Sequence, residues 1–147
     1  MTVIIGSDHG GFALKCRIVE YLTEKNITVE DCGTYTVGAV DYPQIAFVVC
    51  DRVLAETSKG ILVCGTGIGV SICANKVKGI RAALCHSEFD AQMARGHNDA
   101  NVLCLGERTT AEDTALVIVE TFLNGTAEGD RHERRVNMIT EYEGRSI

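Results

Sequence analysis

Gly60-Ile61-Leu62-Val63-Cys64-Gly65-Thr66-Gly67-Ile68-Gly69 is the stretch of sequence that decides the fold. Its first half is an uninterrupted apolar run, which is typical of a strand buried on both faces of a parallel sheet. Three glycines at alternate positions then end the strand, and a helix is expected after them, to about residue 77. Strand, loop and helix in this order form the repeating unit of an α/β fold.

The same alternation runs through the rest of the chain. Strands are predicted at residues 3–5, 27–31, 60–64, 80–85 and 102–105. Other helices are predicted at residues 11–25, 43–54, 87–95, 115–123 and 130–142. Several carry the one-sided apolar stripe of a helix that covers a sheet. We therefore predict an α/β fold: a Rossmann-like, doubly wound parallel sheet of five strands in three α/β/α layers, with an additional C-terminal helix.

Length and composition favour a single domain over residues 1–147. The net charge of −6 disfavours nucleic acid as the main partner, since phosphate backbones require clustered Lys and Arg. The apolar runs are too short to span a membrane, and no basic segment followed by an apolar one opens the chain. We therefore expect a cytoplasmic protein that contacts neither nucleic acid nor membrane.

The seven cysteines form no CxxC pair and no zinc-ligand spacing. They are scattered through apolar segments, which indicates reduced thiols in a reducing compartment. Most are expected to act as small core side chains, with one or none reactive. No metal site is predicted.

Ligands of such folds bind beyond the carboxyl ends of the strands. Residues 7–11, 64–69 and 85–87 follow the first, third and fourth strands. Residues 95–99 (RGHND) instead lead into the fifth strand, so within one subunit we expect them at the opposite edge. A functional role there would serve the site of a neighbouring subunit.

The glycine loop has two readings. Its backbone N–H groups can converge on an anion, either a phosphate or a developing oxyanion, or the glycines can simply allow a tight turn. The loop is neither a Walker loop, since no Gly-Lys-Ser/Thr follows, nor a GxGxxG dinucleotide loop.

Cys64 directly precedes this loop, near the positive end of a helix, a setting that favours the thiolate. It can act as a nucleophile, as a proton acceptor or as a packing residue. A cysteine phosphatase would need an arginine at position 70, where this chain has Val70. At the end of the first strand, Asp8 can be a helix cap or a catalytic acid, whereas His9 in a glycine turn is harder to explain by packing.

Over essentially its whole length the sequence resembles ribose-5-phosphate isomerase type B, in the family shared with galactose-6-phosphate isomerase subunits. The resemblance is carried by residues 6–11 (GSDHGG), 41–43 (DYP), 64–69 (CGTGIG), 74–76 (ANK), 79–82 (GIRA), 95–103 (RGHNDANVL) and 131–136 (RHERRV). It implies interconversion of ribose 5-phosphate and ribulose 5-phosphate, a step of the pentose phosphate pathway, without metal or cofactor.

The resemblance also implies residue roles. Cys64 would be the base that moves a proton between the first two sugar carbons, and the backbone of residues 65–69 would stabilise a cis-enediolate, with Thr66 oriented toward it. His97 would open the furanose ring, and Asn98 would bind beside it. Asp8 would contact a sugar hydroxyl, and the phosphate would be held by His9, Arg131 and Arg135. The other expected substrate contacts are Tyr42, Gly65, Gly67, Ile68, Gly69 and Arg108.

The family builds each site across a homodimer interface, which would account for the position of His97; the assembly would be a dimer or a tetramer. One branch of the family uses a glutamate base at the position of Val70, so this chain resembles the cysteine-using branch. Arg134 and His132 receive no role. Two alternatives stay open: the same chemistry on a hexose 6-phosphate of the allose type, and a non-catalytic nucleotide- or flavin-binding module.

Overall fold

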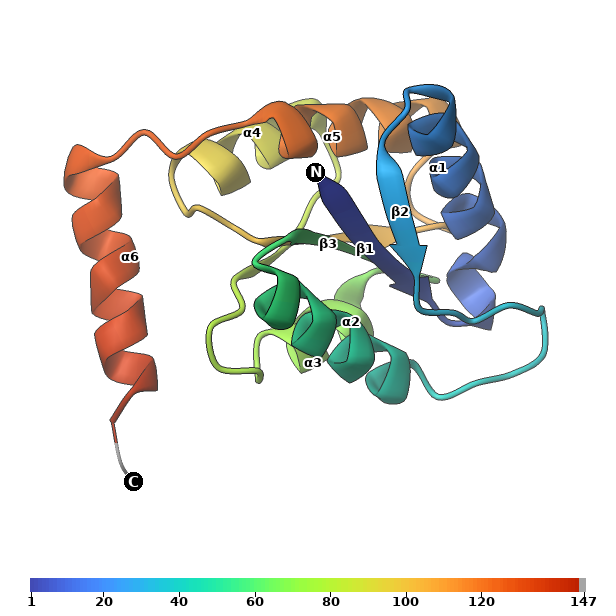
Figure 1. The fold of residues 1–147 in the computed structure, drawn as a ribbon, viewed down its shortest axis with the longest axis horizontal. Helices are drawn as coiled ribbons and strands as arrows, with labels where there is room; N and C mark the ends of the chain where they lie inside the picture. The colour runs from blue at the N-terminus through green and yellow to red at the C-terminus, as the bar shows by residue number, and fades with distance from the viewer. Residues whose placement is uncertain (146–147) are drawn as a thin grey trace.

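A parallel sheet of five strands forms the centre of the computed structural model, which describes residues 1–145 (Figure 1). The strands are β1 (Thr2–Ser7), β2 (Thr28–Asp31), β3 (Lys59–Cys64), β4 (Ala82–Leu84) and β5 (Val102–Gly106). Their order in the sheet is β2-β1-β3-β5-β4, and every neighbouring pair is parallel. The predicted number and direction of strands are confirmed.

Helices alternate with these strands as predicted. They are α1 (Phe12–Glu24), which follows a short 3₁₀ turn at His9–Gly11, α2 (Tyr42–Glu56), α3 (Ile68–Ala74), α4 (Glu88–Gly96), α5 (Glu112–Asn124) and α6 (Asp130–Glu143). Pro43 lies in the first turn of α2, where no intrahelical N–H is required. The Ser87 side chain accepts a hydrogen bond from the backbone N–H of Asp90 and so begins α4.

Two hydrophobic cores lie on the two faces of the sheet. Val3 and Ile5 of β1 point into the core covered by α1, α4 and α5, whereas Ile4 points into the core covered by α2 and α3. Along β3, Ile61 and Val63 likewise alternate with Leu62 and Cys64. This alternation of buried side chains confirms the three-layer α/β/α architecture.

The additional C-terminal helix is also present, but it covers neither core. In Figure 1, α6 stands at one side of the molecule, after an extended linker from α5. His132 is its one buried residue, and Glu143 at its end accepts a hydrogen bond from the backbone N–H of Gly79 at 3.0 Å. Among residues 1–145 no helix has the length and apolar composition needed to cross a membrane.

β4 and α3 are shorter than predicted, and the side chain of one residue marks both the end of α3 and the start of β4. The Asn75 amide accepts from the backbone N–H of Ala82 at 2.8 Å and donates to its carbonyl at 3.0 Å. These bonds end the helix at Ala74 and fix the start of the strand. The apolar residue Ile80, assigned to the strand on hydropathy, instead forms a turn with Val77.

Candidate active site

The glycine loop directs a backbone N–H group at the sulfur of Cys64. Cys64 is the last residue of β3, and its Sγ accepts a hydrogen bond from the N–H of Gly67 at 3.1 Å. Gly67 has a φ of +76°, and a Cβ there would lie 2.5 Å from the Leu84 side chain and 2.9 Å from the Leu105 backbone. Glycine is therefore required both by the backbone conformation and by the space available.

The loop after β1 lies against this glycine loop. The backbone N–H of Asp8 bonds to the Val63 carbonyl at 3.3 Å, and a Cβ on Gly10 would lie 3.2 Å from the nitrogen of Gly65. The Asp8 carboxylate accepts the N–H of Gly11 at 3.1 Å, so the capping reading of Asp8 is confirmed. A carboxylate has further lone pairs, and capping therefore leaves Asp8 able to accept a hydroxyl proton as well.

Two aromatic side chains lie at the same edge of the sheet. His9 is exposed, and its Nδ1 accepts a hydrogen bond from the Val40 N–H at 3.3 Å, which leaves Nε2 as the protonated nitrogen of the neutral ring. The ring of Tyr42, at the start of α2, packs on Gly69, where a Cβ would lie 2.8 Å from it.

Arg108 places a cation beside the loop. The segment after β5 is tied to it by bonds from the Glu107 N–H to the Cys64 carbonyl and from the Arg108 N–H to the Gly65 carbonyl, both 2.9 Å long. The Arg108 guanidinium lies 3.0–3.4 Å from the position of a Cβ on Gly65. We call the residues gathered at this edge of the sheet the carboxyl-edge group: Asp8, His9, Tyr42, residues 64–69 and Arg108.

His97 and Asn98 lie at the other edge. They lead into β5, whose first residue, Val102, pairs with Gly60, whereas its last residue, Gly106, pairs with Cys64. Four steps along a strand cover about 13 Å, so Cys64 and His97 are at opposite ends of the sheet. The sequence prediction of opposite edges is confirmed.

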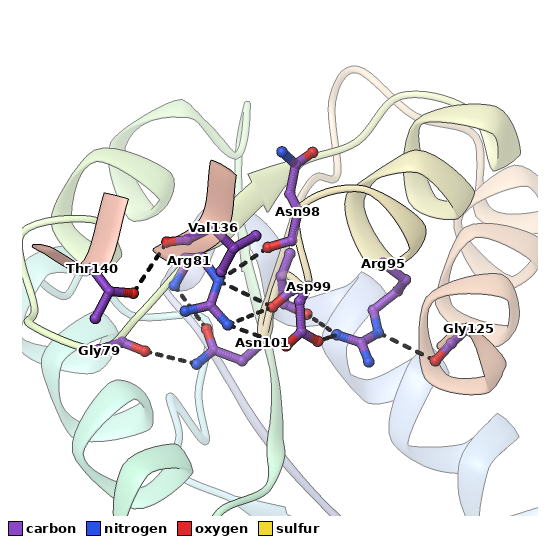
Figure 2. A network of polar contacts seen from close by, with 10 residues as sticks. Gly79, Arg81, Arg95, Asn98, Asp99, Asn101, Gly125, Val136 and Thr140 are labelled. Atoms are coloured by element: carbon purple, nitrogen blue, oxygen red, sulfur yellow. Dashed lines mark hydrogen bonds and ion pairs between the residues drawn. The ribbon is translucent and has the colours of Figure 1, made fainter. Parts of the chain in front are cut away.

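A polar network fixes the segment that carries His97 and Asn98 (Figure 2). The Arg81 guanidinium donates to the carbonyls of Asn98 and Asp99, at 3.0 and 2.8 Å. Arg95 donates to the Asp99 carboxylate at 2.8 Å and to the Ala100 carbonyl at 2.6 Å. These bonds hold Asp99 at a φ of +44° and leave the Asn98 side chain exposed.

Helix α6 adds its own charged side chains at this edge. The ring of His97 stacks on that of His132, and the exposed Arg131 and Arg135 lie on the same helix. His97 and His132 both line a cavity of about 410 Å³ between α6 and the end of α4. We call this set the amino-edge group: His97, Asn98, Glu128, Arg131, His132 and Arg135.

Three members of the amino-edge group have the atoms to bind a metal but not the orientation. Donor atoms of His97, Glu128 and His132 all lie within 4.8 Å of one another. The two imidazole planes, however, are only 10° from parallel, so their nitrogen lone pairs run side by side and do not converge on one point. This stacked arrangement therefore does not form a coordination site.

Cys64 differs from the other buried cysteines in its hydrogen bond. Among the described residues, no backbone N–H group bonds to the sulfur of Cys50, Cys85 or Cys104. Burial raises the pKa of Cys50 and of Cys85 to about 12, and raises that of Cys104 well above its usual value. All three stay protonated near neutral pH and pack in the cores, as the sequence predicted for most cysteines.

Sequence reasoning assigned no role to Arg81, Glu128 or His132. Arg81 and His132 lie within the blocks that carry the resemblance, and Glu128 lies four residues before His132. Helical spacing gives no signal for this pair, because α6 begins only at Asp130 and Glu128 lies in the linker before it. The approach of Glu128 and His132 to His97 depends on where α6 packs, which local patterns do not specify.

Known proteins match this chain in sequence and fold over nearly its whole length. The chain is 45% identical to ribose-5-phosphate isomerase B of Escherichia coli, over 97% of each chain. A ribose-5-phosphate isomerase B structure from Clostridium thermocellum has a TM-score of 0.95 at 48% identity, over 97% of each chain. The Mycoplasma genitalium enzyme, solved with bound ribulose 5-phosphate, has a TM-score of 0.95 at 45% identity and covers 99% of this chain and 97% of its own. Residues 3–139 match the model of the Ribose/Galactose Isomerase family, and this chain, an isomerase, belongs to that family.

Proposed function

We propose that this chain interconverts ribose 5-phosphate and ribulose 5-phosphate through a cis-enediolate, with Cys64 as the base. The observation that supports the proposal most strongly is the position of the Cys64 sulfur, which lies 3.1 Å from the Gly67 nitrogen. This contact lies where β1 and β3 end side by side. In parallel sheets this edge is where ligands bind. The relatives that share this fold at 45–48% identity carry the same activity in their names.

The chemistry follows from the carboxyl-edge group. The Cys64 thiolate takes the proton from the second carbon of the open-chain aldose, and electrons shift to the carbonyl oxygen as the enediolate forms. The same sulfur returns the proton to the first carbon, while the hydroxyl proton moves between the two oxygens, so the ketose forms without a change in composition. Backbone N–H groups of residues 65–69 stabilise the oxyanion, and one such donor typically contributes about 2.7–4 kcal/mol to the transition state.

The amino-edge group completes this site from a second copy of the chain. His97 donates the proton that opens the furanose ring, and Asn98 binds beside it. Arg131 and Arg135 reach the phosphate together with His9 of the first copy. The rigid sheet between Cys64 and His97 supports this part of the proposal, because one chain cannot bring both side chains to one sugar.

We propose further that residues 1–147 act as one isomerase domain in a cytoplasmic homodimer. The seven free thiols support a reducing compartment. Pairing by two-fold symmetry would form two equivalent sites, each with one carboxyl-edge group and one amino-edge group.

Mixing two inactive variants tests both the chemistry and the assembly. We expect Cys64→Ala and His97→Ala each to lose most of the isomerase activity, since general base or acid catalysis contributes about 10²–10⁴-fold. After joint refolding, each mixed dimer has one site with both native groups, so about a quarter of wild-type activity should return. Wild-type turnover by Cys64→Ala would refute the base, and no recovery on mixing would refute the shared site.

A hexose 6-phosphate substrate is the remaining candidate within the family, whose name includes galactose. Parallel measurement of kcat/KM on ribose 5-phosphate and on allose 6-phosphate decides between them. We expect the pentose to be preferred.

A further inference from the structure

A second histidine forms a flat surface under His97. Their ring centroids are 3.9 Å apart and their planes differ by 10°. The His97 side chain is 37% exposed, whereas that of His132 is only 9% exposed. One face of the His97 ring is thus covered by a nearly buried ring, and its other parts remain open to the cavity beside α6.

Glu128 approaches both rings from the linker before α6. Its Oε2 lies 3.7 Å from Nε2 of His97 and 3.5 Å from Nε2 of His132. The backbone N–H of Glu128 bonds to the Gly96 carbonyl at 2.9 Å, which ties the linker to the end of α4. Gly96 also leaves room for the carboxylate, because a Cβ there would lie 2.9 Å from its Oε1.

The surroundings of His132 disfavour its protonated form, whereas the proposed role of His97 requires a proton on its ring. Burial, with His97 and Arg131 beside it, lowers the pKa of His132 below its usual value, and its Nε2 is buried without a hydrogen-bond partner. A neutral ring can stack on a protonated one without charge repulsion. The other charged groups around the pair are Arg81, Asp99, Glu128, Glu133 and Arg135.

The Nε2 of His132 makes no hydrogen bond and lies 3.5 Å from the Glu128 carboxylate, so hydrogen bonding by this nitrogen does not explain the choice of histidine at this position. The feature of His132 that the structure uses is its flat face. An imidazole joins to its Cβ through a torsion with broad preferences, so an unsupported His97 at the end of a helix would sample many ring orientations. Stacking restricts that torsion, and the Glu128 carboxylate, 3.7 Å from Nε2, favours a protonated His97 ring in this orientation.

We propose that His132, together with Glu128, is a positioning residue that holds the His97 ring in the orientation needed to donate its proton to the sugar. This inference rests on the proposed role of His97. It assigns His132 no contact with the substrate. The ring plane of His132, and not its nitrogens, is what catalysis requires.

Two variants at position 132 separate the effect of the ring plane from that of the nitrogens. His132→Phe keeps a flat ring and removes both nitrogens, whereas His132→Ala removes the ring. His86→Ala is the matched control, since His86 is an exposed histidine outside both groups. We measure kcat and KM for ribose 5-phosphate and record the ring-proton chemical shifts of His97 by NMR.

We expect His132→Ala to lower kcat about tenfold or more with little change in KM, and His132→Phe to stay within about threefold of wild type. The upfield ring-current shift of the His97 protons should persist in His132→Phe and disappear in His132→Ala. His86→Ala should change none of these values. If His132→Ala does not fold, His132→Leu replaces it, with similar bulk to the imidazole but no flat face.

The proposal is overturned if His132→Phe and His132→Ala have equal kcat, whether high or low, or if KM alone changes. It is also overturned if wild-type protein has no ring-current shift at His97. The NMR measurement needs no turnover. A wild-type chain without isomerase activity would therefore refute the proposed function, while the shifts of His97 would still report whether His132 orients it.

Discussion

Replacing Gly67 by alanine tests whether steric contacts, as well as the positive φ, require glycine in the loop that follows Cys64. At a φ of +76° an L-residue costs roughly 1–2 kcal/mol. The added Cβ would also lie 2.5 Å from the Leu84 side chain and 2.9 Å from the Leu105 backbone. Overpacking of this kind typically costs about 1–3 kcal/mol, so the free energy of unfolding should fall by roughly 2–5 kcal/mol in total.

Gly79→Ala is the matched control for this substitution. Gly79 has a φ of +89°, but a Cβ there would meet only the flexible end of Leu54, at 3.1 Å. The control therefore carries the conformational cost, about 1–2 kcal/mol, with almost no steric cost. Urea unfolding at equal protein concentrations measures both, because the concentration affects the stability of an assembled protein.

We expect Gly67→Ala to be less stable than Gly79→Ala by about 1–3 kcal/mol, or roughly 3–10 °C in Tm for a chain of this size. Gly67→Ala should also lose isomerase activity, because the displaced N–H no longer reaches the Cys64 sulfur, whereas Gly79→Ala should keep it. Equal stability of the two variants would refute the steric argument. Full activity of Gly67→Ala would refute the role of its N–H group.

Three other predictions concern stability and reactivity. The buried Lys15 ammonium contacts both Asp31 oxygens at 2.8 Å and also donates to the Thr34 carbonyl. Asp31→Asn removes the negative charge at this contact and should cost about 3 kcal/mol or more in urea unfolding, whereas Lys15→Met should cost less. The reverse order would contradict this. Burial lowers the pKa of His132 in the folded chain below that of a histidine in the unfolded chain, which is about 6.5. The neutral ring therefore contributes fully to stability at a pH above about 6.5, and this contribution is lost as the pH falls through the lower pKa of the folded state. The Tm of wild type should therefore fall more than that of His132→Phe between pH 7.5 and 5.5, and parallel curves would refute the assignment. In native protein at pH 8, iodoacetamide should label the exposed Cys16 before Cys50 and Cys85, because burial raises the pKa of those two thiols to about 12. Mass spectrometry locates the labels, and early labelling of Cys50 would contradict the burial argument.

The layers of the fold could be predicted because they depend on local patterns. The uninterrupted apolar run at 60–64 and the one-sided stripe of 115–123 each specify an element and the face that it buries. The limits of β4 could not be predicted in the same way. Ile80 is as apolar as a strand residue, but its N–H bonds to the Val77 carbonyl in a turn, and the Asn75 amide pairs with Ala82, where the strand begins.

The residues of the candidate site likewise fall into those that local patterns predict and those that depend on packing. The residues that follow β1 and β3 could be assigned to one crevice, because parallel strands end at the same edge of the sheet. Tyr42 and Arg108 could be included only through the family resemblance, since their approach to Gly69 and Gly65 depends on where α2 begins and how the chain leaves β5. The stacking of His97 on His132 depends on the packing of α6, whose helical pattern says nothing about its neighbours.

The two groups at opposite edges also limit how the proposed reaction can work. β3 and β5 pair along residues 60–64 and 102–106, and all of these residues are buried, with Cys64 5% exposed at the end of β3. No hinge lies between Cys64 and His97, since the pairing between them is continuous and the Arg81 and Arg95 bonds fix the segment after His97. A motion that brought them together would have to break the central strands of the sheet, which belong to the most stable part of such a fold. An isomerase that uses both residues on one sugar must therefore bind that sugar between two chains.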